Sequence, residues 1–144
     1  MQQLQQYLSF LAQHWVLTLL LIVVLVALIV VEMRYKSGGG KSVSPENAVQ
    51  LINHEQAVVL DIRDKATFKS SGHIINSINI PKVDLDKQAA RLKQHQEKIV
   101  ICVCATGQAA AMVSDKLLKQ GFTKVKVLAG GLKAWKEAGL PLEK

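Results

Sequence analysis

The sequence is poor in the residues that several classes of site require. Its two cysteines, Cys102 and Cys104, are too few for a disulfide framework or a four-cysteine zinc site. Aromatic residues make up 5% of the chain, and the basic residues behind the net charge of +7 are scattered, so nucleic-acid binding is not expected. Hydrophobic residues make up 49%, which excludes a disordered chain. The composition therefore indicates a folded protein with two free thiols.

Charged residues are absent from the run between Trp15 and Val31. With the mostly apolar residues back to Leu8, this run is long enough for a membrane-crossing helix, which needs about 20 residues. A buried core helix is one alternative, but the run is apolar on every face. A cleaved signal peptide is another, but no Lys or Arg precedes the run. We expect a membrane anchor over residues 1–36, with one transmembrane helix over about residues 8–33.

The basic residues near this apolar run all follow it. Arg34, Lys36 and Lys41 lie on its carboxyl side, and neither Lys nor Arg lies on its amino side. The positive-inside tendency therefore places the carboxyl side in the cytoplasm. Two free cysteines agree with that reducing compartment. The sequence thus predicts a single-pass protein whose C-terminal domain is cytoplasmic.

Strand-like and helix-like segments alternate after a polar linker over residues 37–42. The expected strands cover residues 57–62, 77–81, 98–103 and 125–128. One expected helix begins at Ser44, and the others cover residues 64–69, 83–92, 109–119 and 132–135. The run at 98–103 is the most apolar and is expected to be the central strand. This alternation predicts an α/β domain over residues 43–144, with a mainly parallel central sheet flanked by helices.

The expected central strand leads into Cys104 and an uncharged loop. The loop consists of Ala105, Thr106, Gly107, Gln108 and Ala109 and enters the next expected helix. Ligands of parallel sheets bind at this carboxyl edge, where backbone N–H groups and a helix N-terminus favour a thiolate. Cys104 is therefore a candidate nucleophile, and the five residues after it are a candidate substrate-binding loop. The alternative is that Cys104 is a small buried apolar residue.

Cys102 lies two residues earlier, in the middle of the expected strand, so it shares a face of the sheet with Cys104. We interpret Cys102 as a packing residue. A Cys-x-Cys pair is also able to bind a soft metal. His54, His73 and His95 have no evident reason to converge on this pair, so no metal and no cofactor are predicted.

Four segments, in order along the chain, resemble the rhodanese-like domain family of sulfurtransferases. They are Val58 to Asp64, Gly72 to Pro81, Cys104 to Gly107, and Val127 to Trp135 with Gly139 to Pro141. Together they span the whole domain expected after the linker. A membrane helix ahead of one such domain also resembles a group of bacterial membrane-anchored rhodanese-like proteins. This second resemblance implies the inner membrane of a bacterium as the location.

The family resemblance implies a membrane-anchored sulfurtransferase or persulfide carrier that works through Cys104. In the family, a cysteine thiolate takes sulfur from a sulfane-sulfur donor such as thiosulfate and passes it to a thiol or protein acceptor. The six-residue loop from Cys104 to Ala109 has the sulfurtransferase length. Many active members carry Arg at the position of Ala109, and often a basic or polar residue at the position of Ala105. Their absence favours the alternative function, a catalytically weak module that binds a protein partner at the membrane.

The remaining polar and aromatic residues of these segments are interpreted as structural. Asp61 and Arg63 are expected to form an internal ion pair or a cap at a strand end. His73 resembles a family position that packs beneath the loop. Trp135 is expected to anchor the core, and Gly130 with Gly131 is expected to form a turn.

Overall fold

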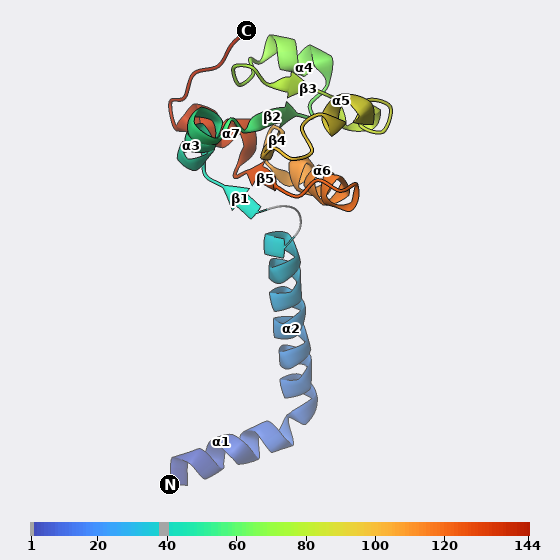
Figure 1. The fold of residues 1–144 in the computed structure, drawn as a ribbon. Helices are drawn as coiled ribbons and strands as arrows, with labels where there is room; N and C mark the ends of the chain where they lie inside the picture. Colours follow the sequence, from blue (N-terminus) through green and yellow to red (C-terminus); the bar gives the residue numbers. More distant parts are fainter. Residues whose placement is uncertain (1, 38–40) are drawn as a thin grey trace. The chain divides into compact units, whose positions relative to one another are not determined.

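The computed structural model describes residues 2–37 and 41–144 of the chain. The chain divides into two compact units, Met1–Ser37 and Gly38–Lys144. Each unit is drawn in Figure 1 with the labels used below. The division falls within the region where the sequence predicts a linker between an N-terminal segment and an α/β domain.

The N-terminal unit contains two helices, α1 (Gln2–Gln13) and α2 (Trp15–Ser37). The single helix expected over about residues 8–33 is therefore wrong in its bounds, because the helix is interrupted at His14. The carbonyl of His14 accepts hydrogen bonds from both the N–H and the hydroxyl of Thr18, which begins the hydrogen bonding of α2. Within the described residues, no helix combines the length and the apolar character needed to cross a membrane, so the expected transmembrane helix is not found there.

The second unit is built on a five-stranded sheet in the order β1-β5-β4-β2-β3. Every neighbouring pair of strands is parallel. The strands are β1 (Lys41–Val43), β2 (Val58–Asp61), β3 (Ile78–Asn79), β4 (Val100–Val103) and β5 (Val125–Leu128). The expectation of an α/β domain with a parallel sheet is confirmed, and β4 is the central strand, as its buried apolar residues predict.

Strand β1 was not expected, because the sequence assigns Lys41 and Ser42 to the linker. Both residues are exposed, but their backbone pairs with Lys126 and Val127 of β5. An edge strand needs backbone partners rather than an apolar side-chain pattern, which is why the sequence does not reveal it. Ser37, also assigned to the linker, ends α2, and residues 38–40 of that linker lie outside the described residues.

The helices cover both faces of the sheet (Figure 1). They are α3 (Pro45–Glu55), α4 (Lys65–Ser70), the 3₁₀ helix η1 (Lys82–Asp84), α5 (Ala89–Lys93), α6 (Gln108–Lys119) and α7 (Gly131–Glu137). One core cluster joins buried residues of α5 and α6 to Val100 and Cys102 of β4. The other joins α3 and α7 to Ile101 and Val103. Successive residues of β4 thus enter opposite cores, as the two-residue period of a strand requires.

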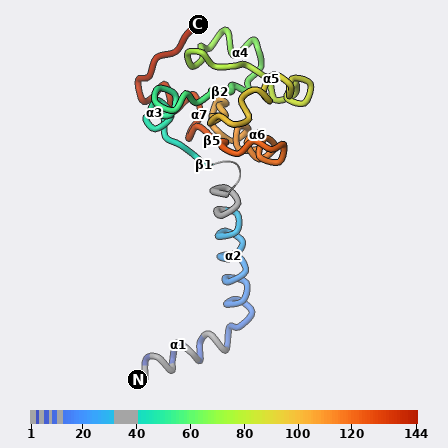
Figure 2. Tube along the Cα trace, in the orientation of Figure 1, coloured from blue at the N-terminus to red at the C-terminus, as the bar shows by residue number. Residues whose placement is uncertain are grey.

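Most expected helices are present, and one is much shorter than expected. Ser44 caps α3 by accepting a hydrogen bond from the N–H of Asn47, and Asp64 caps α4 in the same way. The helix expected over residues 83–92 is instead η1, a series of turns and then α5 (Figure 2). Pro81 precedes η1, and its carbonyl accepts the Asp84 N–H three residues later, which sets a tighter turn than an α-helix.

Candidate functional site

Cys104 lies directly after the central strand β4, at the carboxyl edge of the sheet. Its side chain is buried, with 6% of its surface exposed. The N–H of Gly107 donates a hydrogen bond to Cys104 Sγ, with an N···S distance of 3.0 Å. The loop therefore turns a backbone donor toward the sulfur atom. An N–H donor in this position stabilises negative charge on Sγ, as in a thiolate.

Gly107 makes this turn possible because its backbone is in the left-handed region, with φ of 96°. It is the cap residue before α6, and a side chain at this position would also approach the Leu128 carbonyl oxygen, 3.2 Å from an ideal Cβ. The expectation that the loop glycine permits a tight cradle is therefore consistent with its conformation. Because Gly107 is this cap, α6 begins at the next residue, within the loop that follows Cys104.

The first turn of α7 holds the other side of the loop. The N–H groups of Leu132 and Lys133 donate to the carbonyls of Cys104 and Ala105, at 2.9 and 3.1 Å. The loop carbonyls thus face α7 while the Gly107 N–H faces the sulfur. Gly131 lies so close that a Cβ there would meet the Cys104 oxygen and would lie 2.6 Å from the Ala105 carbonyl carbon. The sequence interpretation of Gly131 as part of a turn missed this close approach between two backbones.

The structure brings all five predicted loop residues together around Cys104. Ala105, Thr106 and Gln108 are exposed, whereas Gly107 and Ala109 are half-buried. Ala109 packs against the core cluster that contains Cys104. None of the five carries a charge. The chemistry of the loop therefore depends on backbone groups and on neutral side chains.

Cys102 has the environment of a packing residue. It is fully buried in the same core cluster as Cys104, which confirms that the two side chains share a face of the sheet. Burial raises the pKa of the Cys102 thiol to about 12, and the neighbouring Cys104 adds to the shift. Cys102 is therefore protonated at neutral pH, which suits packing and not nucleophilic chemistry.

Asp61 and Arg63 form the internal ion pair that the sequence predicts. Arg63 Nη2 lies 2.7 Å from Asp61 Oδ2, and Nε donates to both carboxylate oxygens. The same Nη2 also donates to the carbonyl of Gly72 at 2.9 Å. The two side chains are 7% and 1% exposed. Arg63 is thus committed to holding the chain at Gly72 against the end of β2, rather than offered to a ligand.

His73 and Trp135 also have structural contacts. The His73 ring stacks on Phe68, with ring centroids 3.8 Å apart, and its backbone pairs with Glu143 near the C-terminus. Trp135 is 3% exposed, and its indole N–H donates to the carbonyl of Pro141. Trp135 is therefore the core anchor that the sequence predicts. Across residues 2–37 and 41–144, no group of three or more His, Cys, Asp or Glu side chains is placed to hold a metal ion.

Comparison with families of known proteins matches residues 44–138 to the rhodanese-like domain. This match covers α3 through α7 and includes the whole Cys104 loop. The chain belongs to the rhodanese-like domain family. The resemblance seen in the sequence is therefore confirmed at the level of the family and of its fold.

Relatives of this rhodanese-like chain include proteins with and without an assigned activity. The "Uncharacterized protein YibN" of Escherichia coli is 34% identical over 96% of this chain and 97% of that protein. A "Thiosulfate sulfurtransferase GlpE" of Coxiella burnetii is 30% identical over 67% of this chain and 87% of that protein. Among solved structures, a rhodanese-related protein from Thermoplasma volcanium has a TM-score of 0.64 at 30% identity, over 72% of this chain and 97% of that one.

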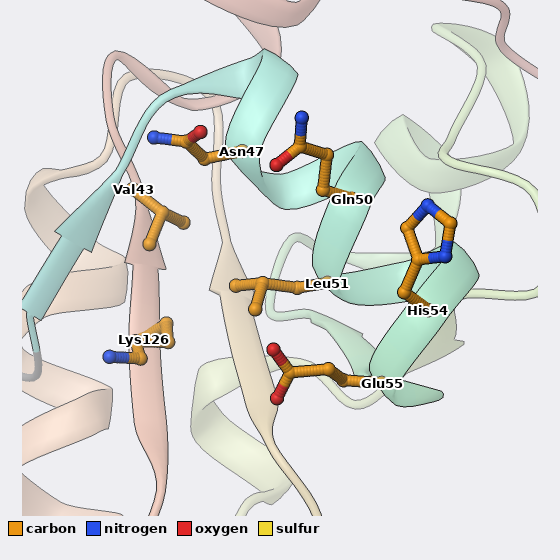
Figure 3. A pocket seen from close by; sticks show the side chains of 7 residues that line it. All are labelled: Val43, Asn47, Gln50, Leu51, His54, Glu55 and Lys126. Carbon is orange, nitrogen blue, oxygen red and sulfur yellow. The ribbon is translucent and has the colours of Figure 1, made fainter.

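Two pockets of the rhodanese-like domain lie away from Cys104. One, of about 320 Å³, lies between α3 and the strands β1 and β5; its lining includes Leu51, His54 and Lys126 (Figure 3). Leu51 packs with the core cluster on the opposite face of the sheet from Cys104. The other pocket, of about 520 Å³, is lined by Ile99 and Val125 at the amino ends of β4 and β5. Neither pocket is therefore placed to receive a group that reacts at the Cys104 sulfur.

Proposed function

We propose that the protein transfers sulfur through a persulfide on Cys104. The observation that carries this proposal is the Gly107 N–H donor 3.0 Å from Cys104 Sγ, at the carboxyl edge of the central strand. The Cys104 thiolate attacks the sulfane sulfur of a donor. A bond forms between the two sulfur atoms, the bond inside the donor breaks, and the leaving group departs with the electron pair. The Gly107 N–H donates to Cys104 Sγ and so stabilises the thiolate that makes this attack.

The second half of the proposed cycle returns the sulfur to an acceptor. A thiolate on a small molecule or a protein attacks the outer sulfur of the persulfide, and Cys104 leaves as a thiolate. This cycle needs no cofactor, and both steps exchange one sulfur–sulfur bond for another. Two relatives support it: the thiosulfate sulfurtransferase of C. burnetii and a polysulfide-sulfur transferase of Wolinella succinogenes. The second is 25% identical, with a TM-score of 0.66 over 81% of this chain and 88% of that one.

Intact-mass measurement tests the proposal directly. After exposure to inorganic polysulfide and removal of the excess, the protein should gain the mass of sulfur, and dithiothreitol should remove it. Cys104→Ser should abolish the gain, whereas the matched variant Cys102→Ser should retain it because Cys102 is buried and protonated. A gain that persists in Cys104→Ser and disappears in Cys102→Ser would show that the wrong thiol has been assigned.

A binding module is the second candidate function. The absence of a cation at Ala105 and Ala109, together with the 6% exposure of Cys104, favours it. In this case the exposed loop would bind a protein partner and Cys104 would carry no sulfur. If no sulfane-sulfur donor loads Cys104 in the folded protein, the result would favour the binding module over sulfur transfer.

We also propose that the N-terminal unit attaches the domain to a membrane. Large apolar side chains are exposed along α2 from Trp15 to Val31, and an exposed apolar surface of this extent is unfavourable in water. The proposed location is the inner membrane of a bacterium, with the rhodanese-like domain in the cytoplasm, since Arg34 and Lys36 follow the apolar run. The protein should stay in the membrane fraction after carbonate washing. A reporter that works only in the cytoplasm should be active when fused after Lys144, and activity of a periplasmic reporter there would reverse the orientation.

A further inference from the structure

The loop around Cys104 carries no charged residue, and exposed apolar side chains occur on the helix that it enters, at Met112, and on the segment bonded to that helix, at Val83. We propose that Cys104 takes sulfur from donors that carry an apolar substituent and a single negative charge, in preference to compact dianions such as thiosulfate. This inference rests on the proposed sulfur transfer and specifies the chemical class of its donor.

The loop has no charged residue between Cys104 and Ala109. Arg63, at the end of the neighbouring strand, is 7% exposed, and its Nε and Nη2 groups are bonded to Asp61 and the Gly72 carbonyl. Lys133 is bonded to the loop through its backbone N–H, but its side chain is exposed. A solvated ammonium on a flexible stem does not supply the paired, planar donors that hold an oxyanion group. The loop therefore offers a dianion little compensation for its lost hydration.

Val83 and Met112 are apolar side chains that are 85% and 57% exposed. Val83 follows Lys82, whose N–H donates to the carbonyl of Ile62 at the carboxyl edge of the sheet. Ile62 in turn donates its N–H to Val103, the residue before Cys104. Val83 is thus placed at the edge where the sulfur lies.

Met112 lies in the first turns of α6, three residues after Ala109 of the loop. The same helix bonds to the segment of Val83, since Lys116 Nζ lies 2.6 Å from Asp86 Oδ2. Lys116 is one helical turn after Met112, and Asp86 is three residues after Val83. The ion pair therefore links the segment that carries Val83 to the helix that carries Met112. In the proposed complex, these two exposed side chains contact the apolar donor substituent.

A matched pair of donors isolates the charge and the substituent. Thiosulfate and benzenethiosulfonate both present a terminal sulfur bonded to an oxidised sulfur, but a phenyl ring replaces one negative oxygen in the second. The Cys104 thiolate forms a bond to the terminal sulfur, and the old sulfur–sulfur bond breaks. The leaving group, which takes the electron pair, is sulfite from thiosulfate and benzenesulfinate from benzenethiosulfonate. Each reaction conserves charge and needs no external oxidant or reductant.

The experiment measures the rate of sulfur addition to the full chain by intact mass with each donor. The ratio of the two rates is compared with the same ratio for a small free thiol at the same pH, which removes the intrinsic reactivity of the donors. The protein's ratio should favour benzenethiosulfonate by at least about tenfold over the small thiol, because the site contacts the phenyl ring and does not compensate the lost hydration of the dianion.

Ala109→Arg supplies the cation at the last loop position, and Ala90→Arg is its control. Ala90 is an exposed residue of α5, so this second variant makes the same change in net charge outside the loop. Ala109→Arg should raise the ratio of thiosulfate loading to benzenethiosulfonate loading by about tenfold. Ala90→Arg should change neither rate. Equal effects of the two variants would show that overall charge, and not the loop, controls the preference.

The outcomes separate this inference from the proposed function. A protein ratio equal to or below that of the small thiol overturns the donor preference but leaves sulfur transfer standing. Loading by inorganic polysulfide alone has the same consequence. The absence of sulfur on Cys104 from both donors and from polysulfide overturns the donor preference and the proposed function together.

Discussion

Replacing Gly131 with alanine tests whether the contact between α7 and the Cys104 loop sets the site. Gly131 has φ of 61°, in the left-handed region, and a Cβ there would lie 2.6 Å and 2.7 Å from the carbonyl carbon and oxygen of Ala105. Ordinary contacts of this kind begin at 3.4 Å. The two backbones must therefore separate by about 0.7 Å or more. This separation lengthens and weakens the hydrogen bonds that Leu132 and Lys133 donate to the loop.

The expected loss of stability has two sources. An alanine in the left-handed region costs about 1–2 kcal/mol. Weakening two backbone hydrogen bonds adds about 1 kcal/mol for each bond. The free energy of unfolding should therefore fall by about 3–4 kcal/mol. Displacement of the loop by nearly an ångström should also slow sulfur loading of Cys104, by up to about 10²-fold.

Gly139→Ala is the matched control for this substitution. Gly139 also has a left-handed φ, of 69°, but a Cβ there meets nothing within 4 Å. Its cost should be the conformational one alone, about 1–2 kcal/mol, with the rate of sulfur loading unchanged. Urea unfolding of both variants measures the stability, and intact mass after exposure to a sulfur donor measures the rate. The reasoning is refuted if the two variants lose equal stability and load sulfur at the same rate.

Three further predictions follow from other contacts. At pH 8, iodoacetamide should modify Cys104 and leave the buried, protonated Cys102 unmodified. Because folding raises the pKa of Cys102 from 9.0 to about 12, its contribution to the free energy of unfolding is complete below about pH 9 and is lost as the pH rises toward about 12. Cys102→Ala should therefore remove part of the alkaline destabilisation seen by urea unfolding. Arg63→Met should lower the free energy of unfolding by about 3–5 kcal/mol because it leaves the buried Asp61 carboxylate unpaired, and adding Asp61→Leu should recover part of this loss. A fragment that begins at Lys41 should unfold cooperatively, whereas one that begins at Ser44 lacks β1 and should be less stable by circular dichroism.

The sequence alone was sufficient for the architecture of the second unit. Alternation of apolar strands with capped helices predicts a parallel α/β sheet, because a parallel connection requires a helical crossover. The apolar run at 98–103 predicts the central strand, and the structure has β4 there. The burial of Cys102 and the Asp61–Arg63 ion pair were also predictable, since both follow from the place of a residue within or at the end of a strand.

Local pattern was insufficient where backbone contacts decide the structure. The short edge strand β1 has exposed residues and pairs through its backbone, so no side-chain periodicity predicts it. The interruption of the N-terminal helix at His14 likewise falls inside a segment that an apolar pattern treats as continuous. Hydropathy describes side chains and is insensitive to the placement of individual backbone hydrogen bonds.

The division is clearest at the Cys104 loop. The sequence by itself determined that a thiol follows the central strand and that an uncharged, glycine-containing loop leads into a helix. Only the tertiary structure decided how that loop is held, because Gly131 and the N–H groups of α7 reach it from more than twenty residues further along the chain. Those contacts turn the loop carbonyls toward α7, while the Gly107 N–H donates to the sulfur. The identity of the nucleophile is thus a local property of the chain, whereas the orientation of the groups around it depends on residues that only folding brings together.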